Sequence, residues 1–382
     1  MLTSKMSSCS ARRGARSLYT SVLDLSINIT KSGKVNTAFG TGGRSSRTGY
    51  TATVFGALGF IGRYVASKLA RHGTITVVPY RDDMKKRFLK VQGDLGVVNF
   101  VEFDARNLKS IQDSVAHSDI VYNCIGADYN TKNFTMADIN IGLAQRIAQA
   151  TKEAGVPRLV HLSSYNANPN SDSIFYATKG LGEQAVKEAY PEATIVRPSP
   201  AFGREDSLLN YLGPKIKMWT PNRNAKEIYP VHVTDVAKAL EHIGYDDSTA
   251  GQTYELFGPE KLSFRDIREM ISGITQDYSQ VGNLDYRYGD YNLPLPLAKF
   301  IADVKQLVYW KTTNSDQIQR HVIDQVIDKN AKTFADLGID KTDVLADVLF
   351  TYAKEWRHPL TSQTLVPLPK ELKRLREMKH FI

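Results

Sequence analysis

The sequence predicts an α/β protein: a doubly wound parallel sheet, followed by a smaller C-terminal domain that is assembled from separated segments. Three observations predict this fold. From residue 50 onward, short runs of β-branched and aromatic residues alternate with amphipathic helical stretches, a pattern typical of parallel strands covered by helices on both faces. A glycine-rich turn joins the first such strand to the first helix. Beyond about residue 205 the alternation becomes irregular, which indicates a second unit.

The glycine turn lies between Val54 and Arg63, in a stretch that reads as a strand, a turn and the start of a helix. Its glycines have a G-x-x-G-x-x-G spacing. Glycine lets the backbone turn tightly, approach a pyrophosphate and pack the helix against the strand, while the N–H groups of the helix N-terminus face the phosphate charge. The stretch therefore predicts a Rossmann-type dinucleotide site, formed here by Gly56, Leu58, Gly59, Phe60, Ile61 and Gly62.

The remaining elements are expected in alternation along the chain. Breakers such as Gly155-Val156-Pro157 separate them. A further segment, Pro230 to Ala237, is expected to return to the main sheet and its helix, which would interrupt the second domain. The expected strands are Tyr50–Phe55, Thr74–Tyr80, Val97–Phe103, Ile120–Cys124, Leu159–Leu162 and Thr194–Val196, and the expected helices run from Ile61 to the stop at His72-Gly73, from Met136 to Ala154 and from Phe175 to Ala189.

Composition excludes several classes of function. No apolar run approaches the ~18 to 20 residues that a transmembrane helix needs, so no transmembrane segment is expected. Cys9 and Cys124 lie far apart and the eight histidines form no H-x-x-x-H pair, so no metal site is expected and His161 and His232 are interpreted as structural. Residues 1–50 carry eight basic residues and one acidic one, which is +7 of the net charge of +9. The folded part therefore has little basic excess for binding nucleic acid.

The ends of the chain suggest a domain division. Residues 1–20 are rich in serine and arginine and contain no acid, a composition typical of a mitochondrial transit peptide; a disordered basic tail is the alternative. Residues 21–48 are expected to form an extended arm or linker. The predicted dinucleotide domain spans 49–260, and the C-terminal domain, with amphipathic helices, spans 261–382 and also receives part of 205–230.

Arg81 indicates which nucleotide is bound. An acid at the end of the second strand, about 20 residues beyond the glycines, takes the ribose hydroxyls in domains that prefer NAD. Arg81 holds that place, nineteen residues after Gly62, and its guanidinium would attract a 2′-phosphate, so NADPH is favoured. Asp82 and Asp83 follow and could serve the ribose if the strand ended later. Asp104, after the third strand, is expected to reach the adenine amine, with a turn or helix-capping aspartate as the alternative.

Beyond the glycine turn, the chain resembles the extended short-chain dehydrogenase/reductase family over about residues 50 to 260. The motifs that carry this resemblance occur in the order that the family has them. They are Asn123-Cys124-Ile125-Gly126, Ile139-Asn140-Ile141-Gly142, His161-Leu162-Ser163-Ser164, Arg197-Pro198 with Phe202-Gly203, and Val231-His232-Val233-Thr234-Asp235-Val236-Ala237. The resemblance implies that Ile125, Ser163, Lys179 and Pro198 also line the nucleotide site.

Within that family the chain is similar to the NADPH-binding, matrix-side accessory subunits of mitochondrial respiratory complex I. The resemblance implies a mitochondrial protein on the matrix side of the inner membrane, with other complex I subunits as partners and peripheral contact with the membrane or membrane arm. It also implies a role in assembly or stability of the matrix arm. Three stretches carry this narrower likeness: Val78 to Arg81, Gly126 to Phe134, and Pro191 to Pro198 with Phe202 to Asp206.

The catalytic residues are where the chain departs from the family. Active members use a tyrosine as general acid or base and a lysine four residues later, with a serine after the fifth strand, here Ser163 or Ser164. Lys179 fits the lysine, but Phe175 stands four residues before it and has no proton to give. Tyr176 is one residue along, about 100° around the helix, unless a local helix bulge rotates it back.

Ser163, Tyr176 and Lys179 are therefore interpreted as remnants of a degenerate catalytic site. The expected function is an NADPH-binding subunit without turnover of its own. Two alternatives stay open: an active NADP-dependent reductase or epimerase acting on a carbonyl or a nucleotide sugar, and a free NADPH-sensing regulator with the same fold.

Two amphipathic stretches lie in the C-terminal part. An apolar stripe with helical spacing is flanked by lysines at 299, 305 and 311. It could pack on its own core, or dock on a partner or a membrane surface. The stretch from Lys370 to Ile382 is basic and amphipathic, and it could be a solvated helix or a docking surface. The stripe consists of Leu297, Phe300, Ile301, Val304 and Val308.

Overall fold

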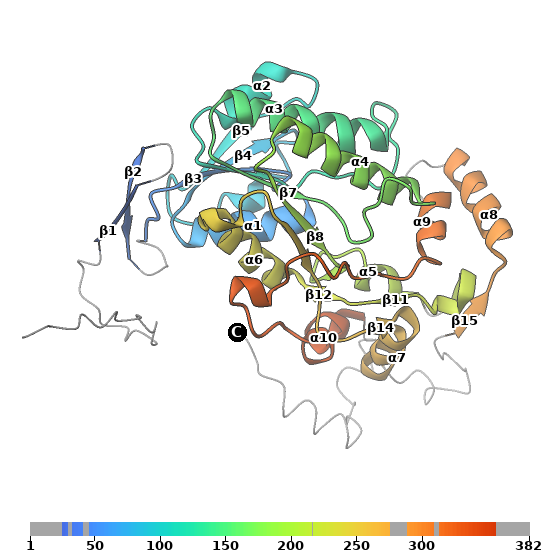
Figure 1. The fold of residues 1–382 in the computed structure, drawn as a ribbon. Coiled ribbons are helices and arrows are strands. Elements are labelled where there is room, and N and C mark those ends of the chain that lie inside the picture. Colours follow the sequence, from blue (N-terminus) through green and yellow to red (C-terminus); the bar gives the residue numbers. More distant parts are fainter. Residues whose placement is uncertain are drawn as a thin grey trace, which may run out of the picture.

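A parallel sheet of seven strands forms the centre of the computed structural model (Figure 1). Every neighbouring pair in this sheet is parallel. The strands, from one edge to the other, are β13 (Thr253–Leu256), β8 (Thr194–Pro198), β7 (Arg158–Leu162), β6 (Ile120–Asn123), β3 (Thr51–Phe55), β4 (Ile75–Tyr80) and β5 (Val98–Glu102). The first strand of the sheet in sequence, β3, lies between β4 and β6, so strand order reverses there, as in the Rossmann fold. The predicted fold class is confirmed.

The structure describes residues 25–29, 33–40, 46–215, 217–275, 289–308 and 313–356. Within these ranges no helix is both long and apolar enough to cross a membrane. The predicted transit peptide and the basic stretch from Lys370 to Ile382 lie outside the described residues.

Helices cover both faces of the sheet (Figure 1). Successive strand residues point to opposite faces, and accordingly Val54 belongs to the core under α1 and α6, whereas Phe55 belongs to the core under α2, α3 and α4. The helices on the first face are α1 (Phe60–Arg71) and α6 (Val233–Tyr245), and those on the second are α2 (Leu108–Val115), α3 (Ala144–Glu153) and α4 (Ile174–Ala189).

The chain enters two of these helices in distinctive ways. Gly59 is the N-cap of α1, and no side chain caps that helix. A π-helical turn, Asp138–Leu143, precedes α3, so the expected helix from Met136 to Ala154 contains a wider turn. Its Asn140 is buried. The side-chain oxygen of Asn140 accepts a hydrogen bond from the backbone N–H of Ala127, in the loop after β6, and its side-chain nitrogen donates one to the carbonyl oxygen of Ala127.

The segment expected to return to the main sheet does so differently. Val231–His232 forms β12, which pairs in parallel with β9 (Ala201–Phe202) in a sheet of its own. The strand that enters the main sheet is β13, beside β8. The expectation was therefore wrong for the strand and confirmed for the helix that follows it, because α6 packs on the main sheet. β13 was not expected, because Glu255 breaks the apolar run by which a buried strand is identified.

The C-terminal unit has a separate core, drawn from three distant segments around residues 202–228, 264–271 and 345–353. This confirms the predicted discontinuous second unit. Its elements are α5 (Leu209–Leu212), β10 (Lys217–Thr220), β11 (Glu227–Ile228), β14 (Leu262–Ser263), α7 (Phe264–Thr275), β15 (Gly289–Asn292), α8 (Leu295–Val308), α9 (Ser315–Arg320) and α10 (Leu345–Ala353), with β10 parallel to β15 and β11 antiparallel to β14.

Two segments cross the expected domain limits, which stay a prediction. Residues of the expected arm form a hairpin of β1 (Leu25–Ile29) and β2 (Val35–Phe39), tied to the body by an ion pair of 2.7 Å between Lys34 Nζ and Asp119. At the other end, Phe334 returns to the core under α1 and α6. An isolated bridge pairs Lys332 with Tyr254 at the edge of the main sheet.

Candidate nucleotide-binding site

The glycine turn between β3 and α1 has no room for side chains. Gly56 has a φ of +78°, and a Cβ added there would lie 2.9 Å from the carbonyl group of Cys124. A Cβ at Gly62 would lie 2.3 Å from the carbonyl oxygen of Gly56. No side chain caps α1 and its first turn holds no acid, so the N–H groups of Phe60 and Ile61 are available to an anion. The turn therefore fits a dinucleotide pyrophosphate.

The other predicted nucleotide residues follow the carboxyl ends of neighbouring strands. Because all seven strands are parallel, these ends lie along one edge of the sheet, where α/β proteins bind their ligands. Arg81 follows β4 directly and is exposed. The other positions at this edge are the glycine turn after β3, Asp104 after β5, Ile125 after β6, Ser163 after β7 and Pro198 at the end of β8.

The two acids after Arg81 are engaged elsewhere. β4 ends at Tyr80, as expected from the sequence, so Arg81 is the first residue after the strand. Asp82 accepts a hydrogen bond of 3.0 Å from the backbone N–H of Met84, and Asp83 forms an ion pair of 2.5 Å with Lys86. These contacts draw both carboxylates into the loop after β4.

Asp104 lies in a turn. Its Oδ1 accepts a hydrogen bond of 3.0 Å from the backbone N–H of Arg106. The cap of α2 is Asn107, whose side chain accepts from the N–H of Lys109. The geometry thus matches the turn alternative for Asp104. The hydrogen bond from Arg106 engages one of the two carboxylate oxygens of Asp104.

The helix that carries the expected catalytic lysine is regular. α4 is α-helical from Ile174 to Ala189, with no bulge that would rotate Tyr176. Tyr176 is fully buried, its ring lies 5.4 Å from that of Tyr165, and its hydroxyl has no hydrogen-bond partner among the described residues. Burial raises the pKa of Tyr176 well above its usual value.

Lys179 and Ser163 face the end of β7. Lys179 Nζ donates a hydrogen bond of 3.3 Å to the carbonyl oxygen of Leu162, and burial lowers the pKa of Lys179 to about 8. Ser163 is buried, and its hydroxyl has no partner within the described chain. Cys124 is no redox candidate, because burial raises the pKa of its thiol to about 12.

A short helix from the C-terminal unit covers the beginning of α4. Asp316 of α9 accepts a hydrogen bond of 2.7 Å from the N–H of Ile174 and one of 3.0 Å from the hydroxyl of Ser173. The guanidinium carbon of Arg320 lies 4.5 Å from the centre of the Phe175 ring. No local pattern predicts these contacts, since about 140 residues separate their partners. We call this set, Ser173, Phe175, Asp316 and Arg320, the α4–α9 joint.

Comparison with known proteins supports a dinucleotide-binding fold around the glycine turn. A family described as "NAD dependent epimerase/dehydratase family" matches residues 52–256. The NADH-ubiquinone oxidoreductase 40 kDa subunit of Neurospora crassa is 44% identical over 93% of this chain and 92% of its own length. The chain belongs to this family of mitochondrial oxidoreductase subunits.

A mammalian member of the family is more distant. The mouse NADH dehydrogenase (ubiquinone) 1 alpha subcomplex subunit 9 is 36% identical over 79% of this chain and 80% of its own length. Among solved structures, a nucleoside-diphosphate-sugar epimerase from Staphylococcus aureus superposes with a TM-score of 0.58 at 16% identity, covering 79% of this chain and 99% of that one. That likeness shows the fold.

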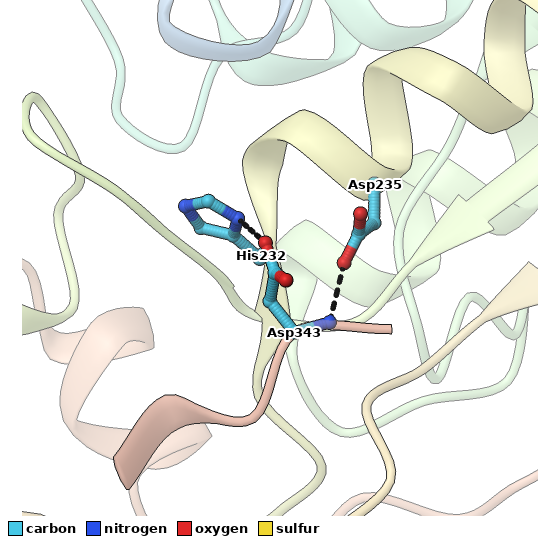
Figure 2. Close-up of side chains that lie close together, drawn as sticks. All are labelled: His232, Asp235 and Asp343. Atoms are coloured by element: carbon cyan, nitrogen blue, oxygen red, sulfur yellow. Dashed lines mark hydrogen bonds and ion pairs between the residues drawn. The ribbon is translucent and has the colours of Figure 1, made fainter. Parts of the chain in front are cut away.

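Within this family fold, the chain also brings together three groups with the chemistry of metal ligands (Figure 2). His232 and Asp235 lie at the start of α6, and Asp343 lies in the segment before α10. Asp343 Oδ2 is 2.6 Å from His232 Nδ1, and the backbone N–H of Asp343 donates to Asp235 at 2.7 Å. Lys238 pairs with the other oxygen of Asp235 at 2.8 Å.

These contacts engage both oxygens of Asp235 and one oxygen of Asp343. The remaining ring nitrogen of His232 lies 2.9 Å from the hydroxyl of Tyr352 in α10. The cluster therefore ties the C-terminal unit to α6, and His232 has the structural role expected for it.

Proposed function

We propose that this chain is a non-catalytic, NADPH-binding accessory subunit of mitochondrial complex I that supports the assembly or stability of the matrix arm. Relatives from Neurospora crassa, Mus musculus, Dictyostelium discoideum and Arabidopsis thaliana are all named as mitochondrial subunits of NADH-ubiquinone oxidoreductase or NADH dehydrogenase. The partners are then the other complex I subunits, and the location is the matrix side of the inner membrane.

The proposal that the protein has no turnover rests on a contrast between the part of the site that would bind the pyrophosphate and the part that would hold the proton donor. The glycine turn keeps the geometry that a pyrophosphate needs, whereas Phe175 takes the place of the acid and the α4–α9 joint covers the start of its helix. Bound NADPH supplies a hydride donor. A carbonyl reduction would also need a proton, and Tyr176, the tyrosine of α4, is buried with a raised pKa.

The residues of the site divide the work of holding the nucleotide. The glycine turn takes the pyrophosphate, Arg81 the 2′-phosphate and Lys179 the nicotinamide ribose. Asp104, Ile125, Ser163 and Pro198, at the ends of the neighbouring strands, complete the site. The engagement of Asp82 and Asp83 with their own loop supports NADPH over NADH, because neither acid is left to favour an unphosphorylated ribose.

Native separation of complexes tests the subunit assignment. Mitochondria are solubilised gently, their complexes are separated under native conditions, and the protein and its nucleotide are followed by mass spectrometry. The protein is expected to migrate with complex I and to carry NADPH. A protein found only as a free small species contradicts the proposal and favours a free NADPH-sensing regulator.

Arg81→Asp tests the choice of nucleotide. Removing the guanidinium that pairs with the 2′-phosphate is expected to weaken NADPH binding about 10- to 100-fold, because a charge-assisted bond contributes about 1.5–3 kcal/mol. NADH binding should change far less. Calorimetric titration measures both affinities, and Arg265→Asp, an exposed arginine on α7, is the matched control. Equal loss of NADH and NADPH affinity would show that another residue binds the 2′-phosphate.

A further inference from the structure

We propose that the loop between β4 and β5 docks on an acidic surface of a neighbouring protein, and that bound NADPH fixes the loop in the form that docks. The docking residues, here called the β4–β5 surface, are Met84, Arg87, Lys90, Val91 and Leu95. The inference rests on the proposed function and deepens it, because it names the residues in contact, the chemistry of the partner and the dependence on the nucleotide.

The outer side of this loop exposes large apolar side chains. Met84 is 63% exposed, Val91 is 84% exposed and Leu95 is fully exposed. Leu95 stands at the corner of a turn, which the N–H of Val97 closes by donating a hydrogen bond of 3.1 Å to the carbonyl oxygen of Asp94. Apolar side chains of this size, exposed together in one short loop, indicate a contact surface.

The inner side of the same loop is anchored on the predicted dinucleotide domain. Leu89 is buried in the core under α1 and α6. Lys86 is buried as well, and its Nζ lies 3.7 Å from the centre of the Tyr80 ring at the end of β4. Because these anchors restrict the backbone between them, the outer side chains form a surface of defined shape.

Two arginines link the loop to the proposed nucleotide site. Arg81, which is expected to bind the 2′-phosphate, is the first residue of the loop. Arg63 follows the last glycine of the turn, and its Nε donates a hydrogen bond of 3.3 Å to the carbonyl oxygen of Gly59. The guanidinium carbon of Arg63 lies 4.4 Å from the centre of the ring of Phe88, in the middle of the loop. A nucleotide on the glycine turn and Arg81 would therefore restrain the loop at its beginning and in its middle, which lowers the entropy that docking must remove.

The charge of the loop selects the partner. Arg87 and Lys90 are exposed, and within the described chain neither forms an ion pair, whereas the two lysines before them pair with the two acids after Arg81. Carboxylates on a partner would complement these two cations. Methionine and arginine are also enriched at the cores of protein interfaces. The partner is therefore a protein surface on which acids surround an apolar hollow for Val91 and Leu95.

Other occupants fit this surface less well. A second copy of the chain would place Arg87 and Lys90 against the same cations, and facing like charges are unfavourable. A bilayer that contains anionic lipid would meet the exposed Asp94, which stands directly beside Leu95 at the corner of the turn. A second copy and a lipid surface are therefore outcomes of the test that would contradict the proposal.

The apolar stripe on α8 is a separate surface. Phe300 is 66% exposed, and Leu297 and Val304 are each 48% exposed. Packing of the stripe on its own core is therefore wrong for these three residues, and docking on a partner or a membrane stays the prediction for them. The side chain of Val308 lies outside the described residues.

Photo-cross-linking in intact complex I tests the partner. A photo-activatable amino acid is placed at Leu95 or, as a control, at Val326, which is exposed outside the β4–β5 surface. The purified complex is irradiated, and mass spectrometry identifies the linked peptides. Position 95 is expected to link to another subunit, at a peptide in which acids flank apolar residues, and position 326 is not. Links from position 95 to a basic peptide, to lipid or to a second copy of the chain overturn the proposal.

Hydrogen exchange of the full chain, with and without NADPH, tests the role of the nucleotide. NADPH should slow exchange of the amides from Met84 to Gln92 about tenfold, because a restrained loop opens less often. The amides of α7, in the C-terminal unit, should not change. Calorimetric titration of the same sample shows whether NADPH is bound. Unchanged exchange of the loop with NADPH bound overturns the proposal, whereas absence of NADPH binding contradicts the proposed function itself.

Substitutions on the β4–β5 surface test its part in assembly. Val91→Ser combined with Leu95→Ser, and separately Arg87→Glu combined with Lys90→Glu, should each reduce the share of the protein that migrates with complex I about tenfold. Val326→Ser and Lys329→Glu, which alter exposed residues elsewhere, are the matched controls. Unchanged melting temperature and NADPH affinity show that the variants fold. Normal entry of both double variants into complex I overturns the docking surface and leaves the proposed subunit function intact.

Discussion

Single residues fix what the nucleotide site can hold. At Gly62 the backbone of α1 passes so close to Gly56 that a methyl group would overlap its carbonyl oxygen. At Lys179 a cation is buried with a carbonyl oxygen as its hydrogen-bond partner. The contribution of each residue to the free energy of unfolding can be measured, by a substitution at Gly62 and by a change of pH at Lys179.

Gly62→Ala is expected to destabilise the protein and to abolish NADPH binding. The added Cβ would lie 2.3 Å from the oxygen of Gly56, so the helix must move, at a cost of about 1–3 kcal/mol. Urea unfolding and calorimetric titration measure the two effects. Gly142→Ala is the matched control, since its Cβ would meet only the end of Arg146, at 3.5 Å. An equal effect of both substitutions would contradict the argument from close packing.

Lys179→Met should change how stability depends on pH. Burial lowers the pKa of Lys179 to about 8 in the folded protein, against about 10.4 when unfolded. Between these values the unfolded chain binds more protons than the folded chain, so the free energy of unfolding rises with pH, by at most about 1.4 kcal/mol per pH unit. Urea unfolding between pH 7.5 and 10 should show this rise in the unchanged protein relative to the variant. Parallel curves would mean that Lys179 is not desolvated.

At the scale of elements, α9 covers the start of α4. Ser173 stands where a residue would normally cap α4, yet its hydroxyl donates to Asp316 and the cap comes from α9. Since α9 packs on α8, a continuous set of contacts runs from α4 through α9 to α8.

Asp316→Ala tests the α4–α9 joint. Loss of a helix cap costs about 1 kcal/mol, because the N–H of Ile174 loses the carboxylate that accepts its hydrogen bond. Hydrogen exchange at Ile174 and Phe175 should accelerate, while the amides of the main sheet keep their protection. Asp113→Ala, an exposed aspartate on α2, is the control. Unaltered exchange at the start of α4 would mean that another group caps the helix.

The sequence predicts those parts of the structure that are determined by residues close together in the chain. The strands β3 to β8 of the main sheet and the glycine turn are predictable, because their apolar runs and glycines are contiguous. β13 is not, because Glu255 is accepted in its middle only through a hydrogen bond from the N–H of Asp328. The joint at Asp316 and the outward turn of Phe300 depend on how distant segments pack, which no local pattern records.

The whole molecule should respond to its nucleotide as a folding ligand. The proposed site joins the ends of six strands of the central sheet, so we expect NADPH to bind the folded chain and not the unfolded one. Free NADPH at a hundred times its dissociation constant should stabilise the fold by about 2.7 kcal/mol. Scanning calorimetry should show a melting temperature that rises with NADPH concentration, without oxidation of the nucleotide. Consumption of NADPH with a carbonyl substrate would instead favour an active reductase.

The contact between Arg320 and Phe175 gives a lost catalytic position a new reason to be kept. In the proposed function Phe175 stands where active members of the family have a proton donor. Its ring contacts Arg320 of α9, the helix whose Asp316 also caps α4. We expect an aromatic ring at 175 to be retained during evolution for packing alone. We therefore expect that Phe175→Tyr alone would not create an active enzyme, because α9 would still cover the start of α4. Catalysis would also require the loss of the α4–α9 joint.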